Sequence, residues 1–342
     1  MGNLFNYKFV LATLVCGSMF FFSFKNEKEI TINSNGNWGF YGHKRINRVA
    51  TFTLPPEMFG FYKEHIEYIT EHAVDPDKRR YAVKGEAECH FIDIDHYGTL
   101  ADNVFGKVPR SWTKAVELFT EDTLRAYGIV PWNIQFMKAK LQKAFEAKNV
   151  DLILKYSADI GHYIADAHVP LHTTENYNGQ MTGQRGIHGL WESRLVEINA
   201  EDYDYFIGKS VYIPKMLDFT WEAVQQSHYA LDSVLRFEKE LTAQFPEDKK
   251  YAYEQRGNVT VQTYSYEFSQ AYHKMLNGMV ERRLRTAILA VGSIWYTAWV
   301  DAGQPDLSKL QNIPPSAELL KEMAELDALY QKGEQKGRDC DH

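Results

Sequence analysis

The sequence has few cysteines and no excess of basic residues. Only 3 of its 342 residues are Cys, which excludes a disulfide-rich scaffold and a four-cysteine zinc site. Its 38 Lys and Arg are outnumbered by 45 Asp and Glu, and the net charge of −7 argues against a protein that wraps nucleic acid through a basic surface. Fixed-period repeats and heptads are also lacking. What is present is 44% hydrophobic residues and 12 His, so we expect a folded chain whose histidines need an explanation.

An apolar run near the N-terminus predicts export. It covers residues 9–24, follows Lys8 and precedes a polar stretch. The run is shorter than the roughly 20 residues of a membrane-spanning helix, and its flanks are typical of a signal peptide. We therefore assign residues 1–25 to a signal peptide or an N-terminal anchor and residues 26–37 to a polar linker. The expected location is periplasmic or secreted, with an uncleaved anchor as the alternative. Whether Cys89 and Cys340 pair stays open.

Apolar side chains recur at helical spacing from Trp38 onward. Between residues 284 and 295, for example, the steps of four, three and four place apolar residues on one helix face. Proline and glycine mark the boundaries. The pattern predicts helices over 55–72, 111–127, 131–148, 149–168, 187–199, 219–244, 262–276 and 279–302, and one beginning at Ser316. The predicted fold class is all-α, with a single large multi-helical domain over residues 38–331 and a polar tail over 332–342.

One segment places two metal-ligand types on the same helix face. Residues 159–172 read DIGHYIADAHVPLH, in which His162 and Asp166 are four residues apart. Ligand types at this spacing can hold one metal ion. Pro170 ends the helix, so His172 comes just after it and is free to turn toward the same site.

A second pair with the same spacing follows a polar, glycine-containing loop. His188 and Glu192 lie in IHGLWESRLVE. A single pair of this kind is more often an ordinary helical hydrogen bond than a metal site. Two pairs and His172 within 31 residues instead indicate metal binding. Imidazole and carboxylate ligands without thiolate suit zinc, and they also suit manganese or iron.

Three short upstream elements carry further candidates. Trp38 and His43 lie in WGFYGH, Asp75 in HAVDPDKRR, and His90 in ECHFIDIDHYG. Taken separately, Asp75 could cap a turn and His90 could pack in a core. Taken with the downstream pairs, the order of motifs resembles the zinc-dependent phospholipase C and single-strand-specific nuclease superfamily.

That resemblance implies an α-helical domain with three zinc ions in a cleft. It implies a first zinc held by Asp75, His90, His162 and a bridging Asp166. A second zinc would be held by His172, His188 and Glu192. A third would be held by His43, Asp166 and the backbone amine and carbonyl of Trp38. In the family this tryptophan is the first residue of the mature chain, whereas 37 residues precede it here. Three zinc ions would outweigh three ligand carboxylates, so an acidic chain can still present a cationic cleft.

The resemblance also implies phosphodiester hydrolysis. Zinc lowers the pKa of bound water to about 7, and Asp75 could orient or deprotonate that water. The leading expectation is a nuclease that hydrolyses single-stranded DNA or RNA by metal-activated water. The alternatives are a phospholipase C acting on phosphatidylcholine-like lipids, and a non-catalytic zinc-binding protein. Glu192 and the short loop before His188 resemble the phospholipase branch, whereas HFID resembles the nucleases.

Other features lead to smaller expectations. Asp159 is a candidate to accept a hydrogen bond from a ligand imidazole. His168 should point to another side of its helix. No obligate protein partner is evident, and the oligomeric state cannot be read from the sequence.

Overall fold

The computed structural model describes residues 40–80, 82–256 and 259–332. The predicted signal peptide or anchor, the polar linker, Trp38 and Cys340 lie outside these ranges. Cys89 is half-buried, and its thiol contacts the carbonyl oxygen of Gly85 at 3.4 Å. Within the described ranges, no helix combines the length and the apolar character needed to cross a membrane.

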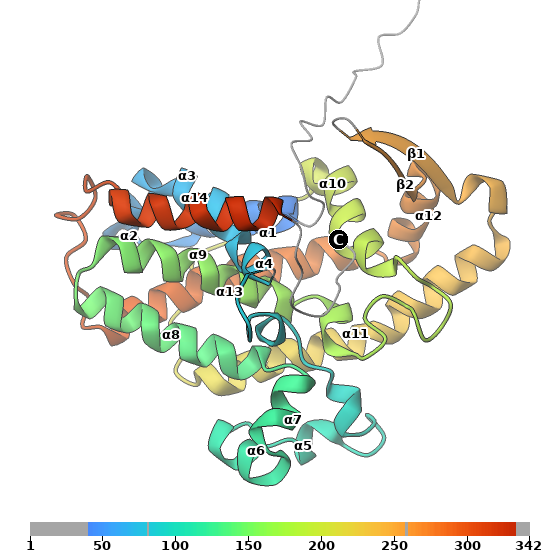
Figure 1. Ribbon diagram of the computed structural model, residues 1–342, viewed down its shortest axis with the longest axis horizontal. Coiled ribbons are helices and arrows are strands. Elements are labelled where there is room, and N and C mark those ends of the chain that lie inside the picture. Colours follow the sequence, from blue (N-terminus) through green and yellow to red (C-terminus); the bar gives the residue numbers. More distant parts are fainter. Residues whose placement is uncertain (1–39, 81, 257–258, 333–342) are drawn as a thin grey trace, which may run out of the picture. The chain divides into compact units, whose positions relative to one another are not determined.

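The predicted all-α class is confirmed, and helices form almost all of the regular structure (Figure 1). The helices are α1 Phe40–Ala50, α2 Pro56–Glu64, α3 Ile66–Glu71, α4 Asp75–Arg79, α5 Val104–Lys107, α6 Trp112–Phe119, α7 Glu121–Ala126, α8 Val130–Glu146, α9 Val150–Ala167, α10 Leu195–Asn199, α11 Met216–Gln244, α12 Tyr266–Met275, α13 Met279–Asp301 and α14 Ala317–Gln331. A two-stranded antiparallel hairpin pairs β1 Tyr251–Arg256 with β2 Val259–Tyr264.

Several boundaries differ from the expected ones. The segment 55–72 divides into α2 and α3 at His65. The segment 111–127 divides into α6 and α7 at Thr120, whose φ of 68° is left-handed and whose hydroxyl accepts a hydrogen bond from the Thr123 amide. The start of 262–276 belongs to β2 instead of a helix. Local capping at Thr120 and strand pairing in β2 therefore override the helical spacing at two of these places.

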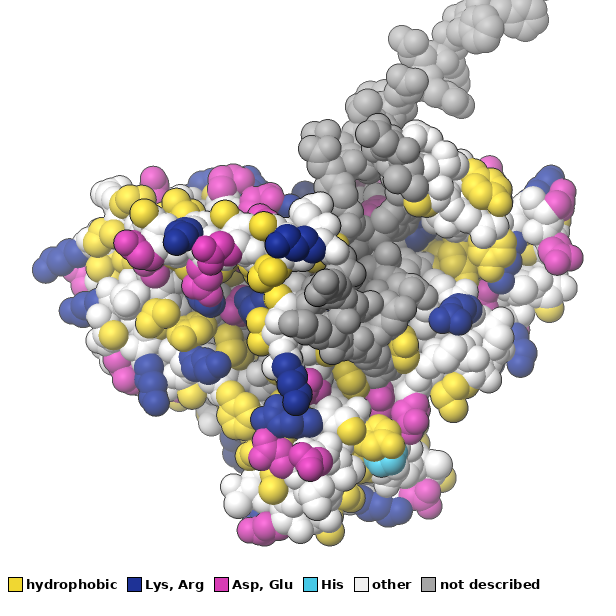
Figure 2. Space-filling model, in the orientation of Figure 1, with side chains coloured by type: hydrophobic (Ala, Val, Ile, Leu, Met, Phe, Trp, Pro, Cys, Tyr) yellow, Lys and Arg dark blue, Asp and Glu magenta, His cyan; other side chains and the backbone are white. Residues whose placement is uncertain are grey.

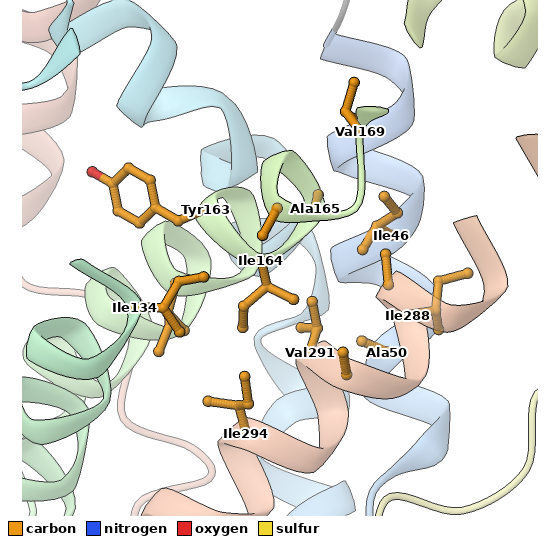
Figure 3. Close-up of a cluster of buried hydrophobic side chains, with 14 of the residues drawn as sticks. Ile46, Ala50, Ile134, Tyr163, Ile164, Ala165, Val169, Ile288, Val291 and Ile294 are labelled. Carbon is orange, nitrogen blue, oxygen red and sulfur yellow. The ribbon is translucent and has the colours of Figure 1, made fainter. Parts of the chain in front are cut away.

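The hydrophobic core lies where α1, α8, α9 and α13 meet. Figure 3 shows Ile46 of α1, Ile164 of α9 and Val291 of α13 pointing into one cluster, and all three are buried. The Trp295 indole of α13 donates to the Ser157 carbonyl of α9 at 3.0 Å. The long helix α9 is thus enclosed by other helices, so polar side chains on it are buried as well.

Helices α1 and α9 approach each other closely at Gly161. A Cβ at this position would lie 2.0 Å from the Asn47 side-chain oxygen, so any larger residue would displace Asn47. Asn47 in turn donates to the Ala158 carbonyl of α9 at 3.0 Å. This close approach brings His43, one turn before Asn47, against His162, and the two rings stack with centroids 3.9 Å apart.

The surface carries both signs of charge. On the face drawn in Figure 2, acidic and basic side chains are interspersed, including those over α14. This distribution agrees with an overall charge of −7 and gives no broad basic surface on that face.

Candidate metal centre

Helix α9 presents the first pair of ligand-type side chains. His162 and Asp166 are both buried, and His162 Nε2 lies 3.3 Å from Asp166 Oδ2. The helix begins after Asn149, whose side chain accepts a hydrogen bond from the Leu152 amide. It ends at Ala167, before Pro170, as the sequence predicts. The structure therefore puts the pair on one face of a regular α-helix.

His90 and Asp77 complete a group around this pair. His90 Nδ1 lies 3.0 Å from Asp166 Oδ2 and 3.1 Å from His162 Nε2. Asp77 Oδ1 lies 3.5 Å from His162 Nε2 and 3.7 Å from His90 Nδ1. These side chains are buried, and the ligand-type atoms of Asp77, His90 and His162 are close enough to share one cation, with Asp166 adjoining them.

Asp75 does not lie in this group, contrary to the expectation from the sequence. Its carboxylate pairs with His72 Nδ1 at 2.8 Å and with Lys78 Nζ at 3.0 Å. Burial alone would raise the pKa of Asp75, but His72 and Lys78 lower it. Asp75 and Asp77 are two residues apart at the start of α4, and such residues point in nearly opposite directions on a helix. The packing of α4 against α9 places Asp77, and not Asp75, toward His90.

His43 joins the α9 pair from the other side. Its Nε2 atom lies 3.5 Å from Asp166 Oδ1 and 3.3 Å from Glu192 Oε1. The two oxygens of Asp166 therefore face different imidazoles, with Oδ2 toward His90 and His162 and Oδ1 toward His43. This is the arrangement of a bridging carboxylate. The backbone of Trp38, the remaining expected ligand here, lies outside the described residues.

His172, His188 and Glu192 form a separate group. Glu192 Oε2 lies 2.7 Å from His188 Nε2 and 3.2 Å from His172 Nε2, and the two nitrogens are 3.2 Å apart. His172 lies on a 3₁₀ turn, Pro170–Thr173. Glu192 lies on a π-helical turn, Gly189–Arg194, that leads into α10. Turns of this kind are rare and are often found at functional sites; the sequence predicted an ordinary helix here.

The protons on two of these imidazoles can be assigned from their hydrogen bonds. His162 Nδ1 lies 2.9 Å from the Ala73 carbonyl oxygen, and His172 Nδ1 lies 2.7 Å from the His90 carbonyl oxygen. A carbonyl oxygen only accepts, so each Nδ1 carries a proton. A ring protonated at Nδ1 alone presents a lone pair at Nε2, and both Nε2 atoms face carboxylate oxygens. A second proton or a metal ion at Nε2 makes this arrangement favourable.

The pKa shifts of these residues also indicate that the site favours positive charge. Burial opposes charge on His162, but Asp166 and Asp77 overcome it and raise the pKa of this imidazole well above its usual value. Burial also opposes ionisation of Asp166 and Glu192, yet the neighbouring histidines lower the pKa of both carboxyls. The carboxylates thus create buried sites that favour positive charge. A proton or a metal ion can supply it, so the residues fit a metal ion.

Asp159 contacts an arginine instead of a ligand imidazole. Its two oxygens lie 3.1 and 3.0 Å from the Arg79 guanidinium. Arg79 Nε also donates to Glu86 Oε2 at 3.2 Å, and the Tyr163 hydroxyl donates to Glu86 Oε1. Burial alone would raise the pKa of Glu86, but Arg79 and its hydrogen bonds lower it to about 2. Reasoning from the sequence missed Glu86 and Arg79; the available signal was Glu86 four residues before His90.

A pocket adjoins these groups. It is lined by the site residues His43 and Glu192 together with mainly apolar side chains from α1, α10 and α13, including Ile46, Val196 and Leu284. His168 also lines it, with Nδ1 lying 2.7 Å from the Ile164 carbonyl oxygen. Among the described residues, His168 is in none of the three groups that could hold a metal ion.

Comparison with known proteins places the chain in a family. The S1/P1 nuclease family matches residues 38–289, which is most of the chain and includes all the residues of the three groups. A search of curated proteins finds no significant match. The family match confirms the resemblance stated from the motifs. The chain belongs to the S1/P1 nuclease family, and this membership supports a nuclease-type phosphodiester hydrolase.

Proposed function

We propose that this chain is a zinc-dependent phosphodiesterase that hydrolyses single-stranded DNA or RNA. The family membership supports the reaction class. The observation that carries the proposal is the convergence of buried imidazole lone pairs and carboxylate oxygens in three adjoining groups. Ligand sets of imidazole and carboxylate without thiolate suit zinc.

The proposed ligand sets differ from the expected ones at a single position, where Asp77 replaces Asp75. They are Asp77, His90, His162 and Asp166 for the first zinc, His172, His188 and Glu192 for the second, and His43 and Asp166 with the Trp38 backbone for the third. Bound zinc would supply a nucleophile at neutral pH and neutralise the charge of the phosphodiester.

The chain's own residues hold the ligand atoms in place. The carbonyls of Ala73 and His90 orient His162 and His172, as described above. Burial keeps bulk water away, which strengthens each electrostatic contact. Metal binding requires neutral imidazoles, so the protein should lose metal and activity as the pH falls.

Export also remains part of the proposal. Its support is the apolar run over residues 9–24 between Lys8 and a polar segment. Sequencing the N-terminus of the mature protein would test it, and would show whether Trp38 offers a free amine. A mature chain that starts at Met1 would favour the anchor.

One set of measurements tests the function. Purified protein is assayed for zinc by mass spectrometry and incubated in parallel with denatured DNA, RNA and phosphatidylcholine vesicles. We expect bound zinc, cleavage of at least one nucleic acid, and loss of cleavage on chelation or in His162→Ala. His96→Ala is the matched control, because His96 lies outside the three groups.

Each other result has a defined meaning. Hydrolysis of the lipid alone would establish the phospholipase C alternative. Zinc without turnover of any of the three substrates would favour the non-catalytic alternative. Protein without zinc, or with activity that survives both chelation and His162→Ala, would refute the proposal.

A further inference from the structure

A carboxylate stands behind His90, on the side away from the candidate metal position. His90 Nε2 lies 3.7 Å from Glu86 Oε1, whereas Nδ1 faces Asp166 and His162. His162 and His172 are arranged differently, since each bonds a backbone carbonyl through Nδ1 and presents Nε2. His90 therefore presents the opposite ring nitrogen and has a charged acceptor in place of a carbonyl.

Glu86 is held firmly in this position. Its side chain is 11% exposed, and its carboxylate accepts hydrogen bonds from Arg79 Nε and the Tyr163 hydroxyl. Arg79 is fixed by its paired contacts with Asp159. Asp159 and Tyr163 both belong to α9, the helix that carries His162 and Asp166. The same helix thus supplies two ligands and the support for the acceptor behind a third.

We propose that Glu86 is a positioning residue that accepts the Nε2 proton of His90 and so directs the Nδ1 lone pair to the metal. A carboxylate behind a ligand imidazole selects the tautomer, fixes the ring and raises its basicity. The Nε2 to Oε1 distance is about 0.7 Å longer than a normal hydrogen bond of about 3.0 Å, so a small shift of either side chain closes it. This inference rests on the proposed metal dependence.

The role of Glu86 extends to the neighbouring group through the backbone. The carbonyl oxygen of His90 accepts the His172 Nδ1 proton at 2.7 Å, and the Ile92 amide donates to the His172 carbonyl at 2.9 Å. Residue 90 thus contributes its side chain to one group and orients a ligand of the other. We expect loss of Glu86 to weaken the His90 group strongly and the His172 group only slightly.

The first test needs no variant. Long-range ¹H–¹⁵N spectra of the zinc-loaded native protein report which nitrogen of each histidine carries a proton. We expect His90 to be protonated at Nε2, and His162 and His172 at Nδ1. A His90 ring protonated at Nδ1 would overturn the proposal.

The second test compares Glu86→Gln with Glu88→Gln. Glu88 lies in the same short segment, but its carboxylate pairs with Arg125 at 3.5 Å. Competition with a chromophoric chelator measures zinc affinity. In Glu86→Gln we expect one zinc to bind about 10- to 100-fold more weakly, with affinity unchanged in Glu88→Gln. Equal affinity in both variants, or equal weakening of every zinc, would overturn the proposal.

The remaining outcomes are also decisive. If Glu86→Gln does not fold, Tyr163→Phe removes one hydrogen bond from the carboxylate and should weaken the same zinc about 2- to 10-fold; no weakening would count against Glu86. A native chain that binds no zinc would overturn both this inference and the proposed function. If the native chain binds zinc and the Glu86→Gln variant binds it with equal affinity, this inference alone would be overturned.

Discussion

The two His-x-x-x-acid pairs have the same spacing in the sequence and different backbones in the structure. His162 and Asp166 lie on α9, a regular helix of 18 residues. His188 and Glu192 span the start of a π-helical turn of 6 residues. In both pairs the carboxylate reaches the imidazole, at 3.3 Å in α9 and at 2.7 Å in the turn.

The difference lies in what holds each pair. The α9 pair is held by the hydrophobic core, because Ile160 and Ile164 of the same helix are buried among α1, α8 and α13. The turn that carries Glu192 also packs in the hydrophobic core, through Leu190 and Trp191, and it has polar contacts with a distant segment in addition. Arg194 donates to both Glu254 oxygens, one of them at 3.0 Å, and Glu254 lies on β1. Core packing thus supports both pairs, and a long-range ion pair supports the second in addition.

The largest effect is expected from Asp166→Asn. Both oxygens of Asp166 face imidazoles of two different groups, so under the proposed zinc dependence the change should release more than one zinc. A loss of about 4 kcal/mol of electrostatic stabilisation corresponds to about a 10³-fold fall in kcat/KM. Metal analysis measures the loss of zinc, and nuclease assays measure the fall in kcat/KM. Asp151→Asn on the same helix is the control, because its carboxylate accepts the Ser316 amide. Full zinc content in Asp166→Asn would contradict the bridging role.

A smaller and more selective effect is expected from Glu254→Gln. Arg194 is buried, and the substitution weakens its ion pair with residue 254. This should lower the free energy of unfolding by about 1–2 kcal/mol. The loss is smaller than for a fully buried pair because Glu254 is 33% exposed. We expect the zinc of the His172 group to bind about 10-fold more weakly and the zinc of the His90 group to be unaffected. Glu240→Gln, in an exposed pair with Arg236, is the control. Equal weakening of both zincs would remove the distinction between the two pairs.

The smallest effect concerns pH and His228, which supports the segment beside His172. His228 Nδ1 lies 3.1 Å from the Thr173 carbonyl oxygen, and burial lowers the pKa of His228 below its usual value. As the pH falls below about 6.5, the unfolded chain takes up a proton that the folded chain resists, so the free energy of unfolding decreases. Urea unfolding measures the free energy of unfolding of the zinc-free protein at pH 7 and pH 5. This free energy should decrease less between these pH values in His228→Gln than in the native protein. An identical decrease in the two proteins would refute this assignment.

Features determined by nearby residues could be predicted from the sequence. Helical spacing predicted α8, α9 and α13 closely, and the i, i+4 spacing of His162 and Asp166 predicted a shared face. Pro170 predicted the end of α9 and the turn at His172. Each of these depends on contacts within one or two helical turns, which the local sequence specifies.

Features determined by distant contacts could not be predicted in this way. The choice between Asp75 and Asp77 depends on how α4 packs against α9, and the pairing of Glu86 with Arg79 and Tyr163 joins two segments. The hairpin of β1 and β2 and the division of 111–127 at Thr120 were also missed, although both depend on local contacts, because helical spacing describes neither capping nor strand pairing. Helical periodicity carries no information on partners that are dozens of residues away.

The sequence by itself indicated the helical class, the family and most of the residues that meet in the three groups, because those depend on residue type and short spacing. The tertiary structure alone decided which carboxylate meets His90, how the two oxygens of Asp166 are shared between groups, and what supports each ligand. The physical reason is that a metal site requires ligand atoms from several elements to meet within a few ångströms. Packing such as the close approach of α1 at Gly161 sets those distances.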